Sequence, residues 1–98
     1  MSGAFDLSGH SILIVENERG PFVATLQENI EKLGALCVVA DSARWASEIL
    51  ARFTFSAIVI NAERRLFQPY NLPIVVYRGR KLSEVRAIVA RLVEAVKG

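Results

Sequence analysis

The stretch that decides the fold is Ser11–Glu18, SILIVENE, in which four apolar residues are followed at once by a polar, acidic cluster. Residues 12–15 are apolar and mostly β-branched, without polar residues in alternation, which is typical of a strand buried on both faces. Such strands lie in the middle of parallel sheets. Because ligands bind at the carboxyl ends of the strands in open α/β sheets, we expect any site at residues 16–18.

Strands and helices alternate on either side of this stretch. Further apolar runs predict three more strands, over residues 35–40, 57–60 and 72–77, the second of these ending on Asn61. Apolar residues at steps of three and four predict three helices. The helices begin at Pro21, after the cap residues Asp41 and Ser42, and after the cap residue Ser83, and the first stops at Gly34. This order predicts a parallel sheet with helices on both faces.

The connection over residues 62–71 leaves two topologies open. Ten residues are about the shortest crossover that joins two parallel strands, and a full helix does not fit comfortably in them. A looser antiparallel return of the strand at 72–77 therefore stays open.

Composition limits the classes of protein that fit. A chain of 98 residues with 52% hydrophobic and 22% charged residues predicts one small folded domain, with residues 1–10 as a loose lead-in. A net charge of +2 is too small to indicate nucleic-acid binding, and no apolar run is long enough to cross a bilayer. The single cysteine, Cys37, lies in an apolar run and is expected to be buried. We expect a cytoplasmic protein.

The segments ILIVENE, DSARWASEIL, SAIVIN and PIVVYRG resemble the receiver domain of bacterial two-component response regulators. The resemblance covers roughly residues 11–79 and the last helix. It implies an α/β, flavodoxin-like, doubly wound parallel sheet, truncated to four strands in the order 2-1-3-4 with about three helices. Residues 1–98 then form a single truncated receiver-like domain.

The chain departs from the family at the positions that carry its chemistry. The acidic pair of a receiver falls on Glu16 and Asn17, the phosphorylated aspartate on Asn61, and the switch threonine or serine on Arg78. An amide is not a nucleophile towards a phosphoryl donor, and a single remaining carboxylate is a poor magnesium site. We therefore expect no phosphorylation, no metal, no cofactor and no enzymatic activity. Arg78 either takes the place of the metal beside Glu16 or points into solvent.

A protein-contact surface is the function that this pattern favours. Only the helix at 43–53 is left to cover one sheet face, and the strand at 72–77 becomes an edge without charges that discourage pairing. We expect a homodimer or a protein partner at this face or edge, unless LFQPY folds back as a lid. The predicted surface comprises Leu66, Phe67, Tyr70, Leu72, Ile74, Val76 and Tyr77.

The sequence thus predicts a phosphorylation-incompetent pseudo-receiver that acts in signal transduction through protein contact or dimerisation. The alternative is a small α/β domain that binds a small ligand or an anion through the basic turn at 78–81 and Glu16.

Overall fold

A computed structural model describes residues 7–64 and 70–97. Its elements are β1 (Ser11–Val15), α1 (Pro21–Glu31), β2 (Leu36–Ala40), α2 (Ala43–Arg52), β3 (Ala57–Asn61), β4 (Ile74–Tyr77), the short 3₁₀ helix η2 (Leu82–Glu84) and α3 (Val85–Lys97). The four strands form one sheet in the order β2-β1-β3-β4, and every pair in it is parallel. The antiparallel return is therefore excluded, and the predicted flavodoxin-like α/β fold is confirmed.

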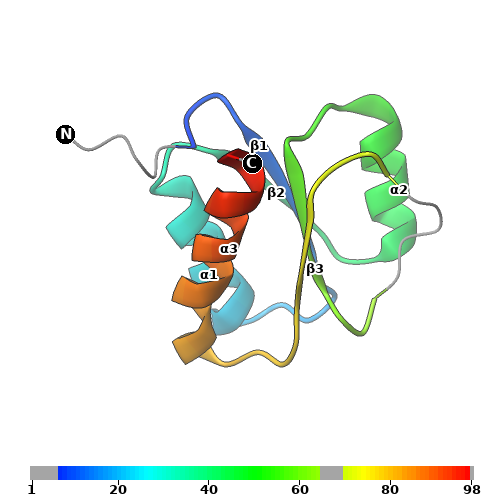
Figure 1. Cartoon of the computed structure of the whole chain (residues 1–98). Coiled ribbons are helices and arrows are strands. Elements are labelled where there is room, and N and C mark those ends of the chain that lie inside the picture. Colours follow the sequence, from blue (N-terminus) through cyan, green and yellow to red (C-terminus); the bar gives the residue numbers. More distant parts are fainter. Residues whose placement is uncertain (1–6, 65–69, 98) are drawn as a thin grey trace.

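The sheet is the middle of three layers. Helices α1 and α3 lie side by side on one face, and α2 lies on the other (Figure 1). The register places Val15 of β1 beside Ile60 of β3, and Asn61 of β3 beside Tyr77 of β4. The residues that follow β1, β3 and β4 consequently meet at one edge of the sheet.

Two hydrophobic clusters fill the spaces between these layers. The larger cluster lies under α1 and α3 and includes alternate residues of the strands, such as Ile12, Val59 and Val75. The smaller cluster lies under α2 and includes the intervening strand residues, such as Leu13 and Ile58. Because β1 and β3 contribute to both clusters, their unbroken apolar runs have a simple physical reason.

The ends of the helices follow local chemistry in most cases. Pro21 opens α1, and Gly34 follows it with a positive φ of 95°, a conformation that glycine adopts without steric cost. The Ser42 side chain accepts a hydrogen bond from the backbone N–H of Trp45 and caps α2, as predicted. The predicted cap at Ser83 is wrong, because Ser83 lies inside η2, which begins after Lys81 and leads directly into α3.

The described helices are all too short or too polar to span a membrane. Cys37 is buried, as expected, and burial, together with the nearby negative charge of Glu31, raises the pKa of its thiol to about 12. A thiol in this state is a poor nucleophile.

Candidate functional site

Glu16 is the centre of a polar network at the carboxyl ends of the strands. It follows β1 directly, and only 1% of its surface is exposed. One carboxylate oxygen, Oε1, accepts hydrogen bonds from the Tyr77 hydroxyl at 2.5 Å and from Asn61 Nδ2 at 3.3 Å. The other, Oε2, accepts from the backbone N–H of Glu18 at 3.0 Å. The carboxylate is therefore buried but well supplied with donors, as a charge in this position must be.

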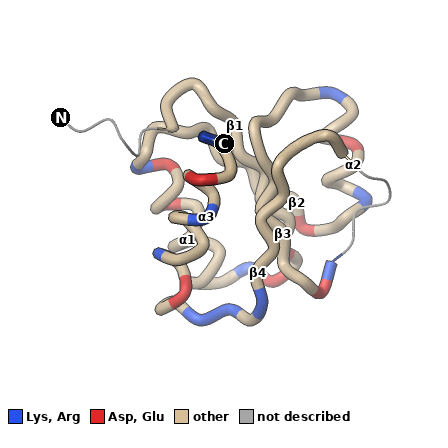
Figure 2. The backbone as a smooth tube through the Cα atoms, in the orientation of Figure 1, with Lys and Arg blue, Asp and Glu red and all other residues tan. Residues whose placement is uncertain are grey.

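Arg80 supplies the positive charge of this network. Its Nε and Nη2 both donate to Glu16 Oε2, at 3.1 Å and 3.0 Å. Its Nη2 also lies 3.1 Å from Glu63 Oε1, and its Nη1 lies 3.6 Å from Glu18 Oε2. Figure 2 shows this basic turn beside the acidic residues that follow β1 and β3. One guanidinium thus sits among three carboxylates, which is a place where other proteins hold a cation.

Asn61 is held on both sides of its amide. Its Nδ2 donates to Glu16 and, at 3.4 Å, to the carbonyl oxygen of Gly79, while its Oδ1 accepts from the backbone N–H of Glu63 at 2.9 Å. The side chain is completely buried. Asn61 therefore joins the loops after β1, β3 and β4, and its fixed, neutral amide offers no nucleophile.

The electrostatic state of Glu16 follows from these contacts. Burial alone would raise the pKa of its carboxyl, but the hydrogen bonds from Arg80, Tyr77 and Glu18 outweigh burial and lower it. Burial and the hydrogen bond to Glu16 raise the pKa of the Tyr77 hydroxyl, so this donor keeps its proton. The hydrogen bond to Glu16 likewise raises the pKa of Arg80. At neutral pH the network holds an ionised carboxylate, a neutral phenol and a guanidinium.

The arginine beside Glu16 is Arg80, not the Arg78 for which the sequence suggested this role. Arg78 is exposed, and so is Asn17, which stands outside the network. Strand β4 ends at Tyr77, and Gly79 follows with a φ of 69°. This left-handed turn brings the chain back so that Arg80 reaches Glu16. Of the predicted degenerate site residues, Glu16 and Asn61 are in contact with each other, while Asn17 and Arg78 lie at the surface.

Sequence reasoning did not include Tyr77 or Glu63 in the degenerate site, and it included Arg80 only as part of the basic turn at 78–81 and not as the partner of Glu16. Tyr77 was assigned to the interaction surface, and that assignment is wrong because its ring is buried against Phe22, with the ring centroids 5.3 Å apart. A signal for Arg80 was present in the sequence, since a glycine between two arginines marks a tight turn that re-aims the second one.

The carboxylates at this edge of the sheet are paired with one arginine. In the described part of the chain, no group of three or more His, Cys, Asp or Glu side chains is arranged to hold a metal ion. The three carboxylates converge on the Arg80 guanidinium instead. Because Arg80 is already neutralised, only the exposed Arg78 and Lys81 of the basic turn are left to attract an anion. The basic turn therefore offers an anion two exposed cations, and Arg64 Nε, close to Asn61, is buried without a hydrogen-bond partner among the described residues.

The predicted interaction surface is divided between several environments. Ile74 and Val76 are 41% and 43% exposed on the edge strand β4. Tyr70 and Leu72 are partly buried against the cluster under α2, and the Tyr70 hydroxyl lies 3.3 Å from Ser47 Oγ. These two residues therefore cover part of this face, and of the LFQPY segment proposed as a lid only Tyr70 lies within the described residues. Leu66 and Phe67 lie outside the described residues.

Comparisons with known proteins bear on the fold alone. No protein-family model matches the chain, and no curated protein matches it. This chain is similar to a solved structure, with a TM-score of 0.59 and 22% sequence identity. That structure is described as the yeast Spc42 trimeric coiled coil, amino acids 181–211, fused to another structure. The match covers 89% of this chain and 62% of that chain, so this chain spans less than two thirds of it.

Proposed function

We propose that this protein is a phosphorylation-incompetent pseudo-receiver that acts through protein contact, and that it forms a homodimer through the exposed apolar side chains of the edge strand β4. The observation that carries the proposal is the closed network around Glu16. In a receiver, the corresponding edge of the sheet holds a metal and a reactive aspartate. Here the Arg80 cation and the Asn61 amide occupy it.

The network leaves no role for a phosphoryl group. An incoming phosphoryl donor needs a metal to neutralise its charge and a carboxylate to attack it. Glu16 is buried and already bound to Tyr77, Asn61 and Arg80. A signal that depends on phosphorylation would require these contacts to be broken, so a contact-based function is the simpler one.

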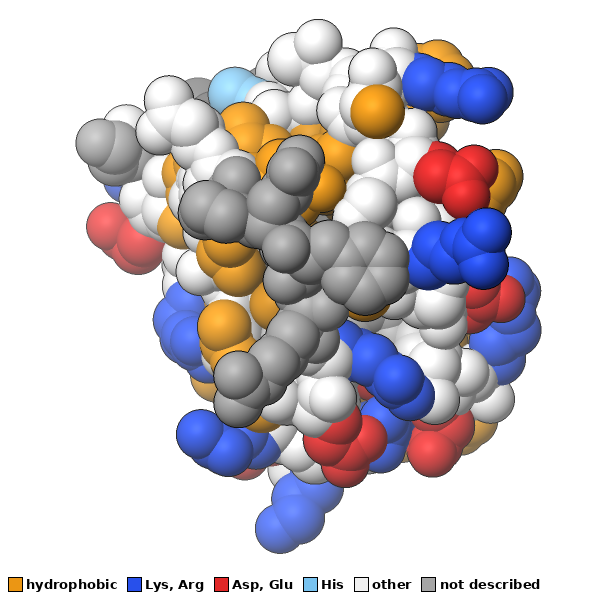
Figure 3. Space-filling view, turned by 90° about the vertical axis from the view of Figure 1, so that its right-hand side faces the viewer, with side chains coloured by type: hydrophobic (Ala, Val, Ile, Leu, Met, Phe, Trp, Pro, Cys, Tyr) orange, Lys and Arg blue, Asp and Glu red, His pale blue; other side chains and the backbone are white. Residues whose placement is uncertain are grey.

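The exposed apolar residues of β4 support the choice of interface. Helix α2 packs over β1 and β2, and Ile74 and Val76 of β4 remain exposed beside it. Figure 3 views the molecule from the side of α2 and shows hydrophobic atoms at the surface, with charged side chains along the left, right and lower margins. The Arg91 side chain donates a hydrogen bond to the Val76 carbonyl on the free edge of β4 at 2.6 Å, so backbone pairing with an added strand is hindered there. We therefore place the proposed contact on the exposed apolar side chains of β4, which a twofold contact with a second copy would cover.

Sedimentation velocity over a range of concentrations tests this proposal. We expect a reversible dimer whose dissociation constant is the same with and without acetyl phosphate and Mg²⁺. Val76→Lys should weaken the dimer at least tenfold, because it places a charge in the interface. The matched control is Ala24→Lys on the exposed surface of α1, which should dimerise like the parent protein. A strictly monomeric parent protein at high concentration, or a Val76→Lys variant that dimerises unchanged, would contradict the proposed interface.

A further inference from the structure

A second apolar feature lies on the opposite side of α2 from β4. It is a groove of about 440 Å³ between α2 and the edge strand β2. The groove is lined by Ser11, Leu36, Val38, Trp45, Ile49, Phe53, Thr54 and Phe55. Neither the Glu16 network nor the proposed β4 interface uses any of these residues.

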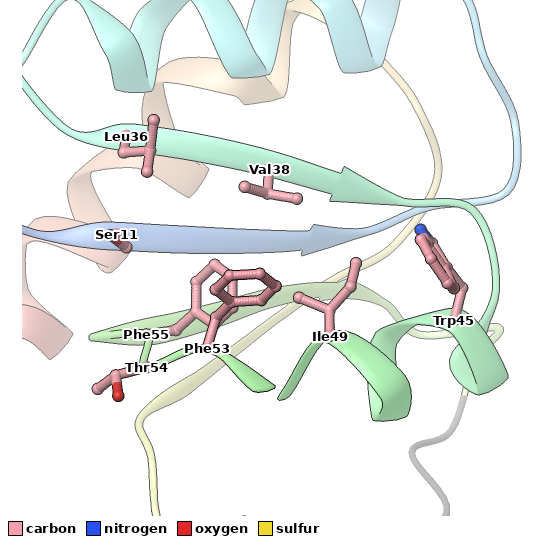
Figure 4. A pocket seen from close by; sticks show the side chains of 8 residues that line it. All are labelled: Ser11, Leu36, Val38, Trp45, Ile49, Phe53, Thr54 and Phe55. Carbon is pink, nitrogen blue, oxygen red and sulfur yellow. The ribbon is translucent and has the colours of Figure 1, made fainter. Parts of the chain in front are cut away.

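The side chains of the groove converge from three parts of the chain. Leu36 and Val38 project from β2, Trp45 and Ile49 from α2, and Phe53 and Phe55 from the segment between α2 and β3 (Figure 4). The Trp45 ring stands at one end of the groove, and Ser11 and Thr54 lie towards the other. Leu36 is 65% exposed and Phe53 is 64% exposed, so the groove opens to solvent. Large apolar side chains that are this exposed and adjacent indicate a binding surface.

The lining chemistry selects the kind of ligand. A volume of about 440 Å³ lies within the range of small-molecule pockets in proteins. Three of the eight lining residues are aromatic, none is charged, and two carry hydroxyl groups at one end. A charged ligand would lose its hydration in the groove without gaining a partner of opposite charge. We propose that this groove binds a small, uncharged, mainly apolar molecule with an aromatic ring and one hydrogen-bonding group.

A partner strand fits the same place less well. β2 is an edge strand, but the Gln27 side chain of α1 donates a hydrogen bond to the carbonyl of Cys37, the second residue of β2, at 3.3 Å. An added strand would need that carbonyl for its own backbone. Gln27 therefore protects this edge against strand addition, while the groove beside it stays open.

The groove contains its own spectroscopic probe, because Trp45 is the only tryptophan of the chain. The full chain is titrated with N-phenyl-1-naphthylamine, an uncharged aromatic amine, and dye fluorescence is recorded by energy transfer from Trp45. We expect saturable binding of one dye per chain. Leu36→Glu should weaken this binding at least tenfold, because it places a charge in the groove. Val76→Glu, which alters the other exposed apolar surface, should leave it unchanged.

Three outcomes would overturn the proposal. The first is no saturable binding to the parent protein, and the second is equal binding to the Leu36→Glu variant while circular dichroism shows both proteins folded. The third is a loss of dimerisation, measured by sedimentation, in Leu36→Glu but not in Val76→Lys, which would make the groove an interface between copies. Dye binding that depends on residue 36 and not on residue 76 supports the groove as the ligand-binding site, whether or not the β4 interface exists.

Discussion

The Glu16 carboxylate is charged and almost completely buried. Its charged form is stable in the folded protein because other groups replace the water that would hydrate it. The Arg80 guanidinium contributes two hydrogen bonds and the opposite charge, while Tyr77, Asn61 and the Glu18 backbone complete the shell. Removing one partner of a buried ion pair costs more than the pair itself contributes, because the remaining charge is left uncompensated.

The first prediction therefore concerns the two arginines of the basic turn. Arg80→Ala should lower the free energy of unfolding by about 3 kcal/mol, since it leaves the buried Glu16 unpaired. Arg78→Ala, the control two residues away, should change it by less than about 0.5 kcal/mol because Arg78 is exposed. Urea denaturation of both variants measures the difference. Equal losses in the two variants would mean that Arg80 does not hold Glu16.

The same residues predict how stability depends on pH. The pKa of Glu16 is lower in the folded protein than its ordinary value of 4.5, so unfolding is accompanied by proton uptake in acid. The contribution of Glu16 to stability is complete above about pH 4.5 and is lost as the pH falls through the lowered pKa. Unfolding free energies of the parent protein should fall over this range. The Glu16→Gln variant should lack this part of the decrease, whereas the control Asn17→Ala should retain it. Identical profiles of unfolding free energy against pH for all three proteins would argue against the lowered pKa.

A third prediction at this scale tests whether Arg80 takes the place of a cation. With Arg80 replaced by alanine, Glu16, Glu18 and Glu63 lose their common positive partner. Mg²⁺ should then raise the thermal midpoint of Arg80→Ala and restore part of the lost stability, because it supplies positive charge to hard oxygen ligands. The parent protein should show no such increase. A magnesium effect of equal size in the parent protein would show that Arg80 does not exclude the ion.

At the level of elements, the turn after β4 decides which arginine reaches the site. Gly79 has a φ of 69°, whereas Gly20 has an extended φ of 168°, and a Cβ atom added to either would meet open space. Gly79→Ala should therefore lower the free energy of unfolding by about 1 kcal/mol through its backbone conformation alone. Gly20→Ala should have a smaller effect. If calorimetry finds equal effects, the left-handed turn is not what positions Arg80.

The elements themselves were largely predictable from the sequence, because apolar periodicity and cap chemistry are local. The doubly buried runs at Ser11–Val15 and Ala57–Asn61, the helix beginning at Pro21 and the cap at Ser42 all appear where the pattern placed them. Position 61 was also found, because it is the last residue of a strand. The sequence did not identify Arg80 as the partner of Glu16, because Arg78 is the first arginine after β4. Only the left-handed turn at Gly79 brings Arg80 to Glu16. The burial of Tyr77 was missed for a related reason, because an edge strand can still bury one of its two faces.

On the scale of the whole molecule, the two sheet faces differ in how well they are covered. α1 and α3 close one face, while α2 alone leaves apolar side chains exposed on both of its sides, at β4 and at the β2 groove. These side chains are exposed, whereas the Glu16 carboxylate between the loops is buried and paired with Arg80. We therefore propose that the surfaces beside α2 bind and that the carboxyl ends of the strands have a structural role.

The most direct test of this assignment is intact-mass spectrometry of the full chain after incubation with acetyl phosphate and Mg²⁺, with an active receiver domain treated in parallel. We expect the receiver to gain the mass of one phosphoryl group and this protein to remain unmodified, because Asn61 cannot form an acyl phosphate and Arg80 occupies the place of the metal. Stoichiometric phosphoryl addition to this chain, removed by mutation of Glu16 or of a neighbouring carboxylate, would contradict the closed network and the function proposed from it.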